Sequence, residues 1–283
     1  MPEKPTTAAG YPPEQVARVK ATCLYLATKL GDLMPELVVV GGLVPSLLVD
    51  QEHLPANVAA HIGTMDLDLG LAFALVGEAR YQEVAERLRH AGFAPDQNEN
   101  GKTTRQRWCI SEPPVTVDFL IEPEKAAESQ AGRLFPLTSD WAAIIAPGLH
   151  LAFKNHRTIK LTGRTIVDET AEREICVCGA GAFVLLKALA FHLRGENKDA
   201  YDLFYLLRSY GRGVSDVAGE LRPLLPDASA RRAMEYLRGD FHASDSIGPR
   251  RTAGFCYGRP DAATQADATG FVRQLSTECK LCW

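Results

Sequence analysis

The sequence predicts a mixed α/β fold, in which an N-terminal module with a mixed sheet and flanking helices is followed by a mainly helical C-terminal domain. Three observations lead to this prediction. β-branched and alternating apolar runs are interspersed with helical spacing up to about residue 175, and mostly helical spacing follows. The composition, 46% hydrophobic and 23% charged over 283 residues, is typical of a globular protein and excludes a disordered or fibrous chain.

Three regions are expected along the chain. Residues 1–13 are rich in proline and predict a flexible leader, followed by the α/β domain over 14–175 and the helical domain over 176–283. No signal peptide and no apolar stretch of about 20 residues is visible, so we expect a cytoplasmic protein without membrane contact. Seven dispersed cysteines predict reduced thiols, with a zinc or redox role for Cys279 and Cys282 as the alternative.

The first elements follow from apolar spacing. A period of 3.6 predicts a helix over 14–30 that ends at Gly31. The β-branched run 37–40 predicts a buried strand. Gly41 and Gly42 then predict a tight turn into a helix, because glycine tolerates the backbone angles that such turns require.

The later elements alternate between the two periods. In chain order we expect a short helix over 44–49 that accommodates Pro45 in its first turn, a loop over 51–63, a strand over 65–73, a helix over 81–90, strands over 106–110 and 115–121 around a turn at 112–114, a hairpin or edge strands within 149–175, and helices over 181–192 and 198–210. Helical spacing continues weakly to residue 238. The last 45 residues contain too few periodic apolar positions to assign elements.

The strand over 65–73 carries the first candidate site. Asp66 and Asp68 are two residues apart, so both carboxylates project from the same face of a strand. Buried like charges repel, and Mg²⁺ is the usual partner of such a pair; a solvated, merely polar strand edge is the alternative. Asp118 favours the cation, because it lies in the apolar run 115–121 and would complete a two-metal site.

The turn upstream of the acids is a candidate phosphate site. Gly41 and Gly42 allow backbone N–H groups to approach phosphate oxygens, and Ser46 can add a hydroxyl about one turn later. No Gly-Lys-Ser/Thr follows, so this turn is not a Walker loop.

Together these residues resemble a known family. A strand, Gly41-Gly42, a helix, Thr64-Met-Asp66-Leu-Asp68 and a later Asp118 resemble the nucleotidyltransferase fold of the polymerase β superfamily. Downstream, Lys187 and the run Lys198-Asp199-Ala-Tyr-Asp202-Leu are very similar to motifs of the AbiEii/AbiGii-type nucleotidyltransferase toxins of type IV toxin–antitoxin systems, including the MenT group. The resemblance covers roughly residues 36–210.

The resemblance implies an enzyme that transfers NMP from an NTP substrate to an acceptor and releases pyrophosphate. It also implies a tRNA 3′ end as the acceptor, growth arrest as the outcome and a cognate antitoxin protein as a partner. The implied roles are metal binding for Asp66 and Asp68 beside Thr64, triphosphate contact for Gly41, Gly42 and Ser46, phosphate contact for Lys187, and a supporting or base-contacting role for Lys198, Asp199 and Asp202.

Two features depart from the family pattern. The spacer between Gly42 and Asp66 is longer than usual, and a frequent arginine four residues before the first aspartate is Ile62 here, next to His61. These departures concern the acceptor and the nucleotide more than the fold.

The lysines can also be interpreted without the resemblance. Lys198 and Asp202 are four residues apart and can pair on one helix face, with an ordinary surface ion pair as the alternative. Lys187 interrupts an apolar helix, so it either extends to solvent or meets an anion.

Charge is distributed unevenly. Residues 36–122 contain thirteen acids and six bases, which suits metal ions, although the whole chain carries a net charge of only −4. Residues 231–260 contain six arginines against three acids, and the interleaved aromatic residues are Tyr236, Phe241, Phe255 and Tyr257. Such a face can follow an RNA backbone, and an ordinary solvated surface is the alternative.

Three other functions use some of the same residue types. The acceptor could be a small-molecule hydroxyl, as in antibiotic-modifying nucleotidyltransferases. The protein could instead be a catalytically degenerate protein that binds a nucleotide or a partner. A glycosyltransferase with a D-x-D motif would leave Gly41-Gly42 and the lysine motifs unexplained.

Overall fold

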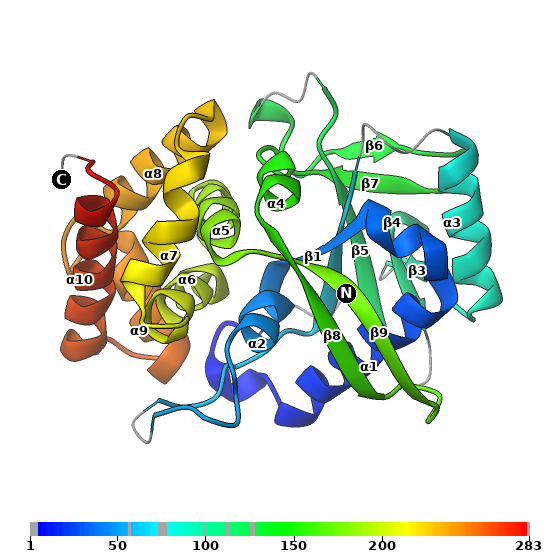
Figure 1. Ribbon diagram of the computed structural model, residues 1–283, viewed down its shortest axis with the longest axis horizontal. Coiled ribbons are helices and arrows are strands. Elements are labelled where there is room, and N and C mark those ends of the chain that lie inside the picture. Colours follow the sequence, from blue (N-terminus) through cyan, green and yellow to red (C-terminus); the bar gives the residue numbers. More distant parts are fainter. Residues whose placement is uncertain are drawn as a thin grey trace. The chain divides into compact units, whose positions relative to one another are not determined.

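The chain forms two compact units, each described here by itself (Figure 1). A computed structural model describes residues 5–55, 58–72, 78–98, 100–110, 114–124 and 128–281. The α/β unit lies within 13–43 and 64–178, and the helical unit lies within 179–281, 44–63 and 5–12. The predicted fold class is confirmed, with a central mixed sheet, flanking helices and a mainly helical C-terminal region.

The α/β unit is built on a mixed sheet of nine described strands. They are β1 (Leu37–Val40), β2 (Asp66–Leu71), β3 (Ala94–Gln97), β4 (Thr103–Ile110), β5 (Val115–Ile121), β6 (Leu134–Pro136), β7 (Ala142–Ile145), β8 (His156–Arg164) and β9 (Thr170–Cys178). The order is β3-β4-β5-β2-β1-β9-β8, and β7 pairs with β5 and β6. β2 runs parallel to β5 and antiparallel to β1, so these three strands form the middle of the sheet.

The middle strands are buried, and their sequences show why. All four residues of β1 are at most 4% exposed, as expected for a strand covered on both faces. In β2, Leu67, Leu69 and Leu71 are buried on one face, and the acidic residues alternate with them on the other. The flanking helices of this unit are α1 (Pro13–Leu30), α3 (Glu78–His90) and α4 (His150–Lys154). α1 packs against β2, β8 and β9.

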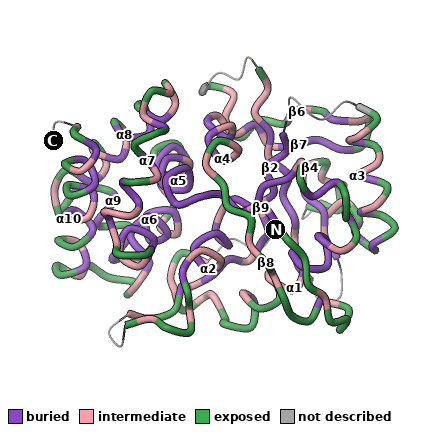
Figure 2. The backbone as a smooth tube through the Cα atoms, viewed as in Figure 1, coloured by how far each residue is buried: buried purple, intermediate pink, exposed green. Residues whose placement is uncertain are grey.

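The helical unit is a bundle around α5. Its helices are α2 (Val44–Leu48), α5 (Ala180–Arg194), α6 (Asn197–Ser209), α7 (Val214–Leu221), α8 (Ala228–Asp240), α9 (Ile247–Tyr257) and α10 (Ala262–Glu278). α5 contacts α6, α7 and α8 and is buried along most of its length (Figure 2). No helix among the described residues has both the length and the apolar character needed to cross a membrane.

Most predicted elements are present. The strands predicted over 37–40 and 115–121 match β1 and β5 to the residue, and β8 and β9 form the predicted hairpin with β8 at the sheet edge. Phe73 of the predicted strand and Glu112 of the predicted turn lie outside the described residues, as does Cys282.

The N-terminal segment differs from the expectation of a flexible leader. The described residues 5–12 belong to the helical unit and contact it. The Asn197 side-chain amide donates a hydrogen bond to the Thr6 carbonyl at 2.9 Å, and the Tyr11 ring lies 5.5 Å from that of Phe255. Part of the segment is therefore packed against α6 and α9.

The C-terminal helices α9 and α10 were not predicted from apolar spacing. The buried positions of α9 include Gly248, Thr252 and Ala253 as well as Phe255. A helix that packs through small or polar side chains leaves no stripe of large apolar residues in the sequence, so the hydrophobic period misses it.

The segment 44–63 also differs from the expected domains. It was predicted as part of the α/β domain but packs with the helices of the helical unit, where α2 contacts α6. The chain therefore enters the helical unit, returns to the α/β unit at Thr64, and enters the helical unit again at Gly179.

Candidate functional site

Three carboxylates converge on one face of the α/β sheet. Asp66 and Asp68 point to the same face of β2, and the parallel register with β5 places Asp68 beside Asp118. One carboxylate oxygen from each residue lies within 4.8 Å of the others. We call these three residues the acidic triad; they can hold a metal ion, because hard divalent cations bind clustered carboxylate oxygens.

Arg107 in β4 pairs with the acidic triad. β4 is antiparallel to β5, with Arg107 opposite Asp118. The Arg107 Nε donates to Asp118 Oδ1 at 2.6 Å, Nη2 donates to Asp118 Oδ2, and Nη2 lies 3.5 Å from Asp66 Oδ2. These side chains are only 5–11% exposed. The hydrogen bonds from Arg107 to Asp118 raise the pKa of the guanidinium above its usual value, so the group is fully charged.

Sequence reasoning missed Arg107, although a signal was present. The predicted strands 106–110 and 115–121 were expected to flank a tight turn. Pairing Ile110 with Val115 across that turn puts Arg107 opposite Asp118, which is the register observed.

Gly41 and Thr64 fit closely around β2. Gly41 has a φ of +72°, and a Cβ atom there would lie 2.7 Å from Asp68 Cγ, so glycine is required both for the turn and for the position of the carboxylate. Gly42 is buried in the same turn. The Thr64 hydroxyl donates to Asp66 Oδ1 at 3.0 Å within the buried part of the site. The candidate residues of this unit therefore lie together at the ends of β1 and β2.

The other predicted site residues form a second cluster, in the helical unit. Lys187 Nζ lies 2.7 Å from Asp199 Oδ1 and 2.8 Å from Asp202 Oδ2. Lys198 pairs with Asp202, as predicted from their spacing, and Arg194 forms a fork with Asp199 at 2.6 and 2.8 Å. Lys187, Asp199 and Asp202 are at most 7% exposed, so the motif is a buried ion network rather than a surface pair.

The charges in this network stabilise one another. Burial alone raises the pKa of Asp199, but Lys187 and Arg194 outweigh this effect and hold it at about 2. Burial lowers the pKa of Lys187, and the carboxylates of Asp199 and Asp202 outweigh that effect and raise it. The pKa of Asp202 is likewise lowered by Lys187 and Lys198 against the effect of burial, so Lys187, Asp199 and Asp202 are all charged at neutral pH.

Ser46 and His61 extend the network into the segment 44–63. The Ser46 hydroxyl lies 2.8 Å from His61 Nδ1, and His61 Nε2 lies 2.9 Å from Asp202 Oδ1. Burial, together with nearby Lys198, lowers the pKa of His61 to about 4, so the ring is neutral. Nε2 therefore carries the proton that Asp202 accepts, and Nδ1 accepts from Ser46.

Two tyrosines that sequence reasoning missed support His61. The Tyr201 ring stacks on it at a centroid distance of 5.5 Å, and the Tyr205 ring lies 4.8 Å away. The Tyr201 hydroxyl also accepts a hydrogen bond from the Ile62 backbone at 2.9 Å. Their helical spacing alone gave no indication of this partner.

The arginine-bearing C-terminal region differs from the expected nucleic-acid face. Phe241 and Phe255 are at most 1% exposed and belong to the core, so the prediction that they interleave with surface arginines was wrong. Tyr236 stacks on His192, with ring centroids 3.6 Å apart. Tyr257, at 56% exposed, is accessible.

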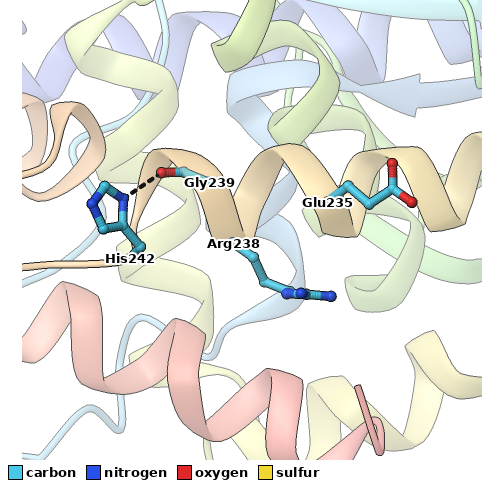
Figure 3. Close-up of a pocket in the computed structure, with 4 residues that line it drawn as sticks. All are labelled: Glu235, Arg238, Gly239 and His242. Carbon is cyan, nitrogen blue, oxygen red and sulfur yellow. Dashed lines mark hydrogen bonds between the residues drawn. The ribbon is translucent and has the colours of Figure 1, made fainter. Parts of the chain in front are cut away.

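A pocket of about 310 Å³ lies along α8 (Figure 3). It is lined by Glu235, Arg238, Gly239 and His242. His242 Nδ1 donates to the Gly239 carbonyl at 2.7 Å, and the buried Nε of Arg238 has no hydrogen-bond partner among the described residues. None of the residues predicted from the nucleotidyltransferase motifs lines this pocket.

Comparisons with known proteins do not identify a family for this chain. No family model matches the sequence, and no curated protein matches it with significant similarity. The basis for a function is therefore the acidic triad with Gly41, Thr64 and Arg107, and the buried ion network of the helical unit.

Proposed function

We propose that the protein is a metal-dependent nucleotidyltransferase that transfers NMP from an NTP to a tRNA 3′ end, as the toxin of a toxin–antitoxin system. The convergence of Asp66, Asp68 and Asp118 within 4.8 Å carries the proposal. The resemblance of Gly41-Gly42, the D-x-D strand and the lysine motifs to AbiEii-type toxins adds the acceptor and the biological role, and the antitoxin as a partner.

The acidic triad suits Mg²⁺ by its donor chemistry. All three donors are carboxylate oxygens, and among the described residues no cysteine or histidine belongs to this cluster. Bound there, one or two Mg²⁺ ions would supply positive charge to the α-phosphate and to the attacking and leaving oxygens.

The residues around the triad have distinct roles in this proposal. Asp66, Asp68 and Asp118 hold the metal, and the Thr64 hydroxyl orients Asp66. Gly41 leaves the space that Asp68 occupies. In the reaction the acceptor hydroxyl oxygen bonds to the α-phosphorus and its proton is released to water, the bond from that phosphorus to the bridging oxygen breaks, and pyrophosphate leaves.

The lysine motif has a structural explanation of its own. Lys187, Asp199 and Asp202 satisfy one another's charges inside the helical unit. Direct contact of Lys187, Lys198 or Ser46 with the nucleotide stays a prediction from the resemblance. A loss of NTP affinity in Lys187→Met, measured under conditions in which circular dichroism shows the variant to be folded, would support it.

The test is transfer of label to RNA. The purified protein is incubated with Mg²⁺, each α-labelled NTP in turn and total tRNA, and the products are resolved on a denaturing gel. We expect label in the tRNA band, lost in Asp66→Asn and Asp68→Asn. Glu174→Gln, which removes an exposed acid of β9 in the same unit, should retain transfer.

Other outcomes point to the other functions. Pyrophosphate release that does not require tRNA would indicate a small-molecule acceptor. NTP binding without release, at any acceptor, would indicate a degenerate binding protein. Hydrolysis of a UDP-sugar but of no NTP would contradict the whole assignment.

A further inference from the structure

We propose that Arg107 is the resident counter-ion of the acidic triad, and that a divalent cation binds by displacing the Arg107 fork from Asp118. This inference rests on the proposed metal-dependent function and adds a residue that sets metal affinity.

The triad needs a counter-charge when no metal is bound. Three carboxylates within 4.8 Å, of which Asp66 and Asp118 are nearly buried, repel one another. Arg107 contacts both of these side chains. A guanidinium keeps its charge at any physiological pH, so it supplies this compensation permanently.

The fork occupies the Asp118 atoms that a metal would use. Nε and Nη2 of Arg107 engage Asp118 Oδ1 and Oδ2 respectively, so both carboxylate oxygens are committed to one planar, bidentate partner. Asp118 lies in β5, between Arg107 on the neighbouring strand β4 and its register partner Asp68 on the neighbouring strand β2. A cation between Asp68 and Asp118 would therefore meet the positive charge of Arg107 at close range.

Two consequences follow from this competition. Removing the positive charge at residue 107 should raise metal affinity, because both the repulsion and the competing hydrogen bonds disappear. Keeping the charge but removing the fork should raise affinity less, because lysine is a point charge without bidentate geometry. A residue that merely held Asp118 in place for the metal would give the opposite result on removal.

The first experiment titrates the protein with Mn²⁺, measures the concentration of unbound Mn²⁺ by electron paramagnetic resonance, and derives the dissociation constant from it. Compared with the wild type, we expect Arg107→Gln to bind at least about tenfold more tightly, since like charges at such distances interact by more than the equivalent free energy. Arg107→Lys should lie between the two. Arg105→Gln is the matched control, because Arg105 lies on the same strand, is exposed and donates to the Thr138 carbonyl; its affinity should stay within about twofold, as for a screened surface charge.

A second measurement is made on the wild-type protein, and a variant is needed only to assign the signal. In the wild type, the Nε–H resonance of each arginine can be followed by ¹⁵N–¹H correlation during a titration with diamagnetic Mg²⁺. We expect the Arg107 signal, assigned by its absence in Arg107→Lys, to shift with the same apparent affinity as metal binding. The Arg105 signal should not shift.

The outcomes separate this inference from the proposed function. Metal binding in the wild type with equal or weaker affinity in Arg107→Gln, or with an unmoved Arg107 resonance, overturns the displacement by Mg²⁺ and leaves the nucleotidyltransferase proposal standing. A wild-type protein that binds neither Mn²⁺ nor Mg²⁺ overturns both.

Discussion

At Gly41, both the backbone conformation and the packing of a neighbouring side chain require glycine. Its φ of +72° is in the left-handed region, and the Asp68 carboxylate occupies the space of a Cβ atom. Gly132 also has a positive φ, but no atom of the described residues packed around it would lie within 4 Å of a Cβ atom there. The two positions therefore separate strain from steric exclusion.

Gly41→Ala should lower the free energy of unfolding by about 3 kcal/mol or more, the sum of left-handed strain and overpacking against Asp68. Gly132→Ala, with a φ of +76° and open space, should cost only about 1–2 kcal/mol. Urea unfolding followed by the fluorescence of Trp108 and Trp141, both buried in the α/β unit, measures the difference. Equal losses would show that Asp68 moves freely away from residue 41.

At the scale of elements, α5 and α6 are joined by buried charge. Lys187 from α5 lies between two carboxylates of α6, and Arg194 at the end of α5 holds one of them. A buried ion pair costs much to break, because the partner stays behind without compensation. The K-D-x-x-D pattern thus fixes the position of one helix on the other.

Lys187→Met should destabilise the protein by about 3 kcal/mol, because Asp199 and Asp202 lose their shared cation inside the helical unit. The matched control is Lys160→Met in the exposed Lys160–Glu172 pair, which should change stability by less than about 1 kcal/mol. Urea unfolding followed by helical circular dichroism measures both variants. Similar effects for the two would indicate that the network is solvated in solution.

At the scale of the whole molecule, stability depends on pH through His61. The pKa of His61 is about 4 in the folded protein, and the ordinary value in an unfolded chain is 6.5. Between these values the unfolded state binds the proton and the folded state does not, so stability falls as pH falls. The stabilisation is fully present above about pH 6.5 and is lost towards pH 4.

We expect this acid-dependent loss to amount to about 3 kcal/mol between pH 6.5 and 4. His61→Gln should show a flatter profile in the same window, although its stability at pH 7 will be lower because the contacts to Ser46 and Asp202 change. Urea unfolding at half-unit pH intervals measures both profiles. An equally steep fall in His61→Gln would assign the dependence to other groups.

Saturating Mg²⁺ should stabilise the α/β unit. At a free concentration of 100 times Kd, binding to the native state alone adds about 2.7 kcal/mol. Thermal unfolding followed by Trp108 and Trp141 fluorescence should shift upwards with Mg²⁺ in the wild type. The shift should be absent in Asp68→Asn; an equal shift in that variant would place the metal elsewhere.

The sequence predicted local features better than distant pairings. β1, β5 and the acids on β2 were predicted because strand alternation and β-branched runs are written within a few residues. The partner of His61 is Asp202, 141 residues away, and no local pattern encodes such a pair. The segment 44–63 was assigned to the wrong region for the same reason. α9 was missed because its buried positions include small residues, and Arg107 because the hairpin register was not followed through.

The separation of His61 and Asp202 also has a consequence for synthesis of the chain. At roughly 5–20 residues per second, roughly 7 to 28 seconds pass between the synthesis of the two residues, which are 141 positions apart. During that time Ser46 and His61 have no Asp202 to complete their hydrogen-bonded chain, although the residues of β1 and β2 on either side of this segment are synthesised. Nascent chains that stop before residue 202 therefore cannot dock the segment 44–63 through the hydrogen bond from His61 to Asp202. We expect a protease to cut within 44–63 more readily in such arrested chains than in finished ones.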